Sequence, residues 1–190
     1  MDFYNLFYTF VIYAFLGWVG EVIYAYIKQK RFVNRGFLYG PFCPIYGSGA
    51  VVIVSIIMYF SSIIPENETS SLVVLFIYSV SITTLIEYIT GVVLEKFFQA
   101  KWWDYSNEKF NLKGYICLKF SLLWGALVLI AYELIHPYLS NVTVNIQSSI
   151  GDILFYPLLL YFTVDFSLTI KSLIDFRSVI IEINKLAEEL

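Results

Sequence analysis

Five long apolar stretches constrain the fold of this chain more than any other feature. They cover residues 3–27, 45–64, 72–98, 115–135 and 150–174. A helix that crosses the hydrocarbon core of a bilayer needs about 20 apolar residues, and each stretch meets that length. With 59% hydrophobic and 14% charged residues, little of the chain remains for a soluble domain. We therefore predict an all-α, polytopic membrane protein with five transmembrane helices.

The basic residues predict the orientation of these helices. Five alternating spans put all twelve Lys and Arg residues on one side of the bilayer. They are Lys28, Lys30, Arg31, Arg35, Lys96, Lys101, Lys109, Lys113, Lys119, Lys171, Arg177 and Lys185. Cytoplasmic loops are enriched in Lys and Arg. We therefore expect the N-terminus outside and the C-terminus in the cytoplasm.

Two segments depart from simple spans. Residues 36–49 are apolar, but their glycines and prolines oppose a continuous helix, so we predict a re-entrant or interfacial segment buried between helices. Residues 175–190 carry apolar side chains at helical spacing, with charged residues largely elsewhere on the surface. We predict a helical transmembrane domain over 1–174 and a cytoplasmic amphipathic helix over 175–190. This helix lies on the membrane or on the protein's own loops, or it binds a partner.

Acidic residues within the spans indicate where a functional site could lie, because ionisable groups in hydrocarbon are costly and usually pair or line a pathway. Glu21, Glu87 and Asp165 lie deepest. Arg35 and Asp104, in two cytoplasmic loops, are the complementary groups, and we predict that they form one polar site with Glu21 and Glu87 below them. The predicted binding residues are Glu21, Asn34, Arg35, Glu87, Asp104 and Asn111. The alternative is that each carboxyl is protonated or bonds a neighbouring Tyr or Arg and only holds helices together.

Several chemistries find no support in the sequence. No run matches the phosphate-binding loop GxxxxGK[ST], so an ATP-driven role would need a partner chain. The single histidine, His136, and the two cysteines, Cys43 and Cys117, lack the spacing of a metal site or a catalytic triad. We therefore expect no metal, no cofactor and no nucleic-acid partner. The catalytic residues are unknown, and the lack of a recognisable catalytic motif favours a protein that is not an enzyme.

Four stretches carry a resemblance to a known family. They are GWVGE at 17–21, NRGFLYGPFCPIYG at 34–47, WWDYS at 102–106 and NLKGYICL at 111–118. In these stretches the sequence resembles the ABC-transporter type IV family of bacterial membrane proteins, also called CmpB-like permeases. The similarity runs through nearly the whole membrane region, and the long second stretch is its most specific part.

The resemblance implies a transport-related, permease-like subunit in the bacterial plasma membrane, with a polar site near the cytoplasmic face. Its partners would be the lipid bilayer and either further copies of itself or a partner ATPase. Two alternatives remain open. One is a membrane-embedded enzyme or binding protein that acts on a lipid headgroup, with Arg35 holding a phosphate. The other is a membrane scaffold that holds partners through its C-terminal helix.

Overall fold

The computed structural model describes residues 3–59, 68–99 and 101–188, and most of them are helical. The helices are α1 (Phe3–Gln29), α2 (Pro44–Tyr59), α3 (Glu68–Phe98), α4 (Leu118–Ile130), the π-helix η1 (Ala131–Ile135) and α5 (His136–Glu188). Two short strands, β1 (Asn111–Leu112) and β2 (Ile116–Cys117), pair antiparallel between α3 and α4. Within the described residues, four helical segments are long and apolar enough to cross a membrane: 3–29, 71–98, 118–146 and 153–179.

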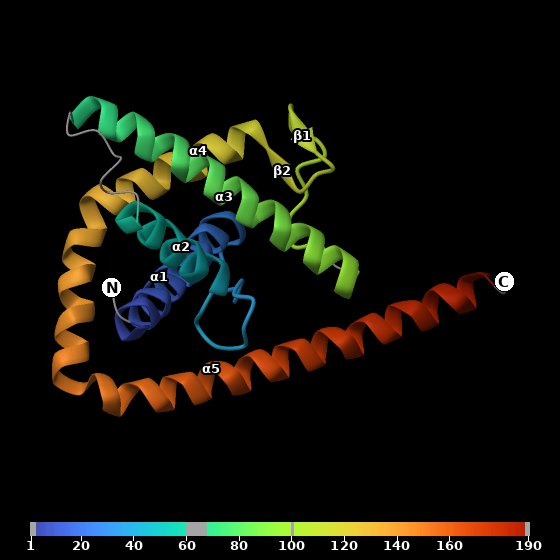
Figure 1. The fold of residues 1–190 in the computed structure, drawn as a ribbon. Helices are drawn as coiled ribbons and strands as arrows, with labels where there is room; N and C mark the ends of the chain where they lie inside the picture. Colours follow the sequence, from blue (N-terminus) through green and yellow to red (C-terminus); the bar gives the residue numbers. More distant parts are fainter. Residues whose placement is uncertain (1–2, 60–67, 100, 189–190) are drawn as a thin grey trace.

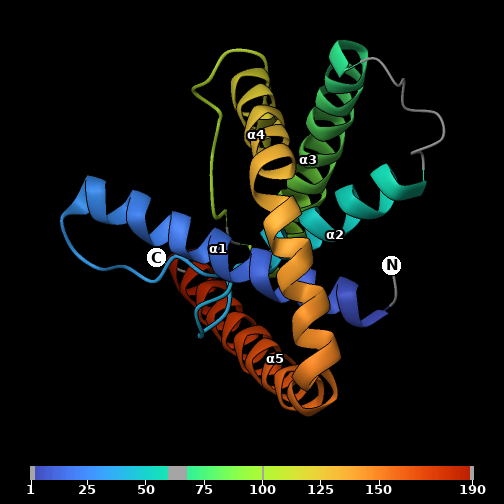
Figure 2. The ribbon, with the colours of Figure 1, turned by 90° about the vertical axis from the view of Figure 1, so that its left-hand side faces the viewer.

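The helices pack in a chain of neighbours (Figures 1 and 2). Helix α1 packs against α2, α2 against α3, α3 against α4, and α5 returns to α1. Ile53, Ile57 and Leu75 form a buried core between α2 and α3. On the other side, Phe7 of α1 contacts Phe155 of α5 with ring centroids 4.8 Å apart. Large apolar side chains also remain exposed along every helix, which suits a surface that contacts lipid.

The spans predicted at 115–135 and 150–174 imply a connecting loop that begins at residues 136–141, and this expectation is wrong, because the chain stays helical from Leu118 to Glu188. Pro137 has no N–H, so it cannot bond the carbonyl four residues earlier and would break a regular α-helix. The structure accommodates it with η1, where the His136 N–H reaches the Ala131 carbonyl five residues back. The fourth predicted span also begins later than expected, at Leu118 rather than at residue 115, because β2 precedes it.

Helix α5 contains 53 residues and continues without a break across residue 174, where we predicted the last span to end. It bends sharply in its orange part (Figure 1), and Pro157 lies inside this helix. Proline inside a helix removes one backbone hydrogen bond and its ring displaces the preceding turn, which accounts for the bend. The last span and the C-terminal segment are therefore one helix.

Helix α2 is shorter than its predicted span. Its 16 residues extend about 24 Å, less than the roughly 30 Å hydrocarbon core of a bilayer. The rest of that predicted span, residues 60–64, lies outside the described residues. The structure thus supports four long apolar helices, and the count of five spans stays a prediction.

The segment between α1 and α2 is held by backbone contacts. The Asp165 carboxylate of α5, only 6% exposed, accepts the N–H groups of Tyr39 and Gly40 at 2.9 Å each. The Cys43 N–H bonds the Ala14 carbonyl of α1 at 2.9 Å. These contacts satisfy an irregular backbone among helices, as an apolar environment requires. Residues 44–49, which we predicted to be irregular, instead form the first turns of α2.

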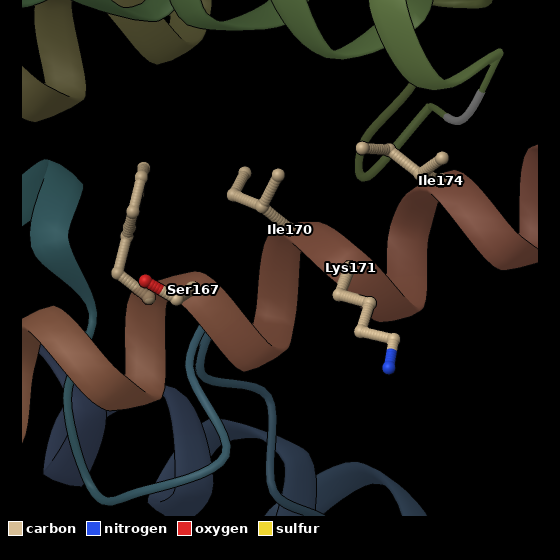
Figure 3. Close-up of a pocket in the computed structure, with 5 residues that line it drawn as sticks. Ser167, Ile170, Lys171 and Ile174 are labelled. Atoms are coloured by element: carbon tan, nitrogen blue, oxygen red, sulfur yellow. The ribbon is translucent and has the colours of Figure 1, made fainter.

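A shallow depression of about 380 Å³ lies along α5 (Figure 3). Its lining residues are Phe166, Ser167, Ile170, Lys171 and Ile174. Ile170 and Ile174 extend toward the side on which α3 lies, and Lys171 extends away from it. Because all five residues belong to one helix and most are apolar, this depression is an open apolar surface of α5 rather than an enclosed site.

Two glycines of α1 offer a matched test of the α1–α2 packing. A Cβ on Gly17 would overlap the Tyr46 ring of α2, whereas a Cβ on Gly20 would meet nothing within 4 Å. We expect Gly17→Ala to lower the free energy of unfolding by about 1–3 kcal/mol, because the ring must move. Gly20→Ala should be neutral or stabilising, by up to about 1 kcal/mol, through helix propensity. Titration of the purified protein with sodium dodecyl sulfate measures both, and equal effects would contradict the close packing.

Candidate functional site

The first half of the candidate site is an ion pair between α1 and the segment that follows it. The Nε atom of Arg35 lies 3.7 Å from Glu21 Oε2, with side chains 37% and 26% exposed. The guanidinium also lies 5.7 Å from the centre of the Tyr24 ring, a cation–π contact. The other oxygen, Glu21 Oε1, accepts the Tyr46 hydroxyl of α2 at 2.6 Å. Both oxygens of Glu21 are therefore engaged.

The second half surrounds Glu87 on α3, which is 7% exposed. Its Oε1 atom accepts the Tyr105 hydroxyl at 2.9 Å and the Trp124 indole N–H of α4 at 3.2 Å. The Tyr105 ring stacks on Phe120 with centroids 4.6 Å apart, which fixes its direction. Burial, and then the Glu87 carboxylate, raise the pKa of Tyr105 above its usual range. Tyr105 therefore keeps its proton and remains a hydrogen-bond donor to Glu87.

The two halves meet at a pair of aromatic rings. Tyr46 and Trp124 lie edge to face, with centroids 6.0 Å apart. Each ring uses its polar atom on a different carboxylate, Tyr46 on Glu21 and Trp124 on Glu87. A continuous set of contacts thus joins side chains from α1, α2, α3 and α4 with the two loops. We call this set the polar cluster; its members are Glu21, Arg35, Tyr46, Glu87, Tyr105 and Trp124.

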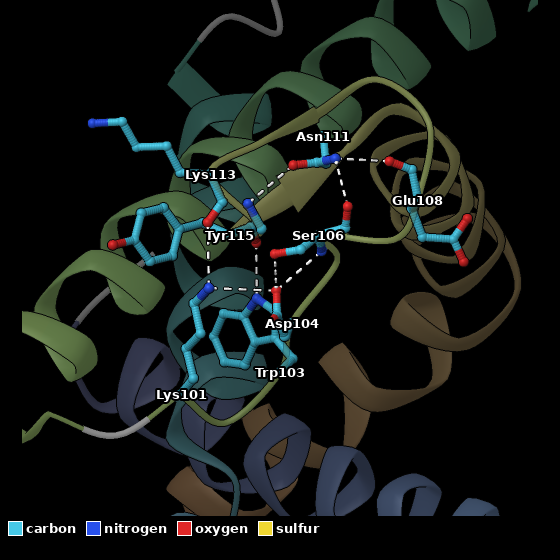
Figure 4. A network of polar contacts seen from close by, with 9 residues as sticks. Lys101, Trp103, Asp104, Ser106, Glu108, Asn111, Lys113 and Tyr115 are labelled. Atoms are coloured by element: carbon cyan, nitrogen blue, oxygen red, sulfur yellow. Dashed lines mark hydrogen bonds and ion pairs between the residues drawn. The ribbon is translucent and has the colours of Figure 1, made fainter.

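Asp104 belongs to a different set of contacts, in residues 101–117 before α4, which include β1 and β2 and which we call the hairpin (Figure 4). Its Oδ1 atom accepts the Ser106 hydroxyl at 2.5 Å and the Ser106 N–H at 3.0 Å. Lys101 lies 3.4 Å away as its ion-pair partner. Gly114 has a φ of +75°, and a side chain there would overlap the Asp104 carboxylate. Glycine at 114 thus permits this turn in two ways.

The hairpin should respond to acid through Asp104. Hydrogen bonds from Ser106, with a smaller effect of Lys101, lower the pKa of this carboxyl. A carboxyl with a depressed folded pKa stabilises the fold above its unfolded pKa of about 3.9, and this contribution is lost as the pH falls through the folded value. We therefore expect an acid transition of the hairpin below about pH 4.

Tryptophan fluorescence measures this transition, since Trp102 and Trp103 adjoin Asp104. The transition should disappear in Asp104→Asn and persist in Asp175→Asn, where the exposed carboxyl belongs to α5. An unchanged transition in Asp104→Asn would show that another group causes it.

The two predicted asparagines shape loops. Asn34 Oδ1 accepts the Trp18 indole N–H at 2.7 Å and the Gly36 N–H at 3.0 Å, and its amide donates to the Tyr39 carbonyl. Asn111 accepts the Gly114 N–H at 3.2 Å. Its amide donates to the Ser106 and Glu108 carbonyls. These contacts hold the segments that carry Arg35 and Tyr105.

The structure therefore brings together some of the predicted binding residues. Glu21 and Arg35 form an ion pair, and the aromatic contacts connect them to Glu87. The ion pairs of Arg35 and Asp104 are with Glu21 and Lys101, respectively. Sequence reasoning missed Tyr46, Tyr105 and Trp124 as members of the site. The sequence does contain a signal for Trp124, because an indole N–H within an apolar helix needs a hydrogen-bond acceptor and therefore indicates a nearby polar group.

The polar cluster offers two carboxylates, one guanidinium and three neutral donors at the junction of four helices. Within residues 3–59, 68–99 and 101–188, no group of three His, Cys, Asp or Glu side chains could hold a metal ion. Hydrogen bonding and charge are the chemistry that the residues of this cluster can provide. Such groups can bind a polar or charged solute, or exchange protons.

Long apolar helices with exposed apolar surfaces and a polar cluster between them define a helical membrane protein. The chain belongs to the family described as "Putative ABC-transporter type IV", whose model matches residues 8–170. This match confirms the resemblance found in the sequence. No curated protein and no solved structure matches the chain.

Proposed function

We propose that this membrane protein is a transport-related, permease-like subunit in which the polar cluster contacts the substrate. The observation that carries the proposal is the continuous set of polar and aromatic contacts, from four helices, that joins Glu21 and Arg35 to Glu87. Polar groups at such positions are costly and recur along substrate and ion pathways. Glu21, Arg35 and Glu87 are retained from the predicted binding residues. Asn34, Asp104 and Asn111 act by shaping the two loops.

The proposal includes a topology. The protein lies in the plasma membrane with five spans, α2 being part of the second, its N-terminus outside and residues 175–190 as a cytoplasmic amphipathic helix. The one-sided Lys and Arg residues support this orientation. Since the sequence contains no phosphate-binding loop, transport driven by ATP requires a partner ATPase, and a homo-oligomer is the other assembly that would complete a pathway.

A second candidate function is the binding of a lipid headgroup. It is favoured by Arg35, whose side chain is 37% exposed although it pairs with Glu21. Arginine presents a planar set of donors that matches a phosphate group. In this case the same residues would act on a membrane lipid instead of a solute.

Isosteric substitutions distinguish these functions. Untargeted mass spectrometry would compare cells that lack the protein with cells that carry the native chain, Glu21→Gln, Glu87→Gln or Glu133→Gln. Glu133→Gln is the control, because this glutamate is exposed on η1. We expect one solute to change its distribution between cells and medium in the deletion strain and in the first two variants only. A change confined to lipids would favour the headgroup function, and native profiles for both variants would refute the transport proposal.

Affinity purification tests the assembly. The tagged native chain, extracted in a mild detergent, should retain an ATPase or migrate as an oligomer in native mass spectrometry. A monomer without any bound protein would contradict both assemblies.

A further inference from the structure

The two carboxylates of the polar cluster differ in how their charge is balanced. Glu21 has Arg35 as a cationic partner at 3.7 Å and uses both of its oxygens. Glu87 is 7% exposed and has no Lys or Arg ion pair within the described part of the chain. Its Oε2 atom is buried, and among the described residues it has no hydrogen-bond partner. Glu87 is therefore the member of the cluster with unused binding capacity.

The ligand that fits this oxygen is small. Tyr105 and Trp124 both donate to Oε1, so they leave the second oxygen open and cannot neutralise the charge. An ionised carboxylate in an apolar environment is costly unless a cation or a proton compensates it. A proton needs no cavity and forms a single O–H bond on Oε2. The required ligand chemistry is thus that of a proton donor.

A route for this proton begins at the hairpin. Tyr105 is half-buried and reaches Glu87 from a loop in which Asp104 and Ser106 are exposed. Its hydroxyl group is both a donor to the carboxylate and a potential acceptor from water, as proton transfer through a hydroxyl requires. The Tyr105 hydroxyl gives its proton to Oε1 while it accepts one from hydronium, which becomes water, so the carboxylate becomes a neutral carboxyl group. Rotation of this group about its Cγ–Cδ bond then moves the O–H to the open Oε2 position, and the Tyr105 hydroxyl again donates to the unprotonated oxygen. Release reverses these steps.

The other groups around Glu87 determine what the proton would affect. The hairpin contributes Tyr105, and β2 contributes Cys117, which acts electrostatically on Tyr105. Helix α4 contributes the non-titrating Trp124, and α2 contributes Tyr46. Beyond Tyr46 lies the ion pair of Glu21 and Arg35. A change in charge at Glu87 therefore acts on the remaining cluster through two aromatic rings.

We propose that Glu87 is a reversible proton-binding site, with the proton on Oε2, and that its occupancy couples protons to the polar cluster. The coupling in this inference rests on the proposed function, because a proton can be coupled to transport only if the protein transports a solute. The protonation itself does not depend on that function. It requires only the burial, the open oxygen and the hairpin route.

Infrared difference spectroscopy tests the site directly. The full chain would be reconstituted in vesicles of phosphatidylcholine and phosphatidylglycerol, and spectra at neutral and acidic pH compared. We expect a carboxylic-acid carbonyl band that differs from the band of solvated carboxyl groups and shifts in deuterium oxide. The band should be lost in Glu87→Gln and retained in Glu133→Gln. Glu87→Asp should restore a carboxyl band, which separates loss of the acid from loss of the fold.

A second variant tests the position of the proton. Tyr105→Phe removes one hydrogen bond to Oε1, the carbonyl oxygen of the protonated form, so the band should move to higher frequency. A band unchanged by Glu87→Gln would overturn the proposal. So would a native protein that shows no acid band but responds to replacement of potassium by sodium at constant pH, because that result indicates a metal cation. The mass-spectrometric test of transport described above can give a negative result independently of these spectra, so the two proposals can be refuted separately.

Discussion

Replacing Asp165 with alanine is expected to release the segment between α1 and α2 and to lower the free energy of unfolding by about 3–5 kcal/mol. The carboxylate accepts two backbone N–H groups, of Tyr39 and Gly40, at 2.9 Å each. A hydrogen bond to a charged group contributes about 1.5–3 kcal/mol, and the substitution removes the acceptor of two part-buried N–H groups. Because Arg35 belongs to the same segment, its ion pair with Glu21 should weaken as well.

Denaturation by sodium dodecyl sulfate measures the loss in stability, and hydrogen exchange locates it at residues 36–43. Asp165→Asn keeps one carbonyl oxygen but directs an amide toward the second N–H. It should therefore recover little of the stability that Asp165→Ala loses. Asp175→Ala is the matched control, since this aspartate is exposed on the same helix. Equal stabilities of the Asp165 and Asp175 variants would show that the carboxylate does not hold the segment.

The second large effect is expected when Glu87 loses both of its donors. In the double variant Tyr105→Phe, Trp124→Phe, neither of these donors remains on Oε1, although an aromatic ring stays at each position. A buried carboxylate without partners costs several kcal/mol, and we expect a loss of about 3–5 kcal/mol in unfolding free energy. Adding Glu87→Leu should recover much of this loss, because an apolar side chain needs no donors.

The comparison of double and triple variants isolates the polar contribution, since both carry the same changes at 105 and 124. Detergent-solubilised proteins would be compared by thermal unfolding monitored by circular dichroism. A triple variant that is no more stable than the double variant would mean that the rings contribute by packing alone. It would also weaken the argument that Glu87 is held in place by its donors.

Much of the architecture follows from local sequence. Apolar length predicted the long helices at both ends of the chain and α3, since each stretch is long enough to cross a bilayer. The chain between residues 130 and 141 was harder to predict, because His136–Pro137 is also the pattern of a turn. Whether a proline ends a helix or is absorbed by a π-helix depends on neighbouring helices, which a sequence pattern does not contain.

The site was predictable only in part, for a similar reason. Glu21 and Arg35 lie 14 residues apart, on either side of the end of α1, so a contact between them needs little knowledge of the fold. The partners of Glu87 come from a hairpin and from α4, and their meeting depends on how α3 and α4 rotate about their axes. For Asp104, the cation three residues earlier, Lys101, is its partner in the structure, whereas the sequence interpretation favoured the distant Arg35.

The uninterrupted course of α5 has a mechanical consequence. From Asp165 to Glu188 the helix forms a stiff rod about 35 Å long, at 1.5 Å per residue. Its near end is fixed to the backbone of Tyr39 and Gly40, in the segment that also carries Arg35. A rigid rod transmits rotation along its length, so a torque on the far end would act on the segment that carries Arg35. We therefore expect a load on the C-terminal helix to reach the ion pair of Arg35 and Glu21.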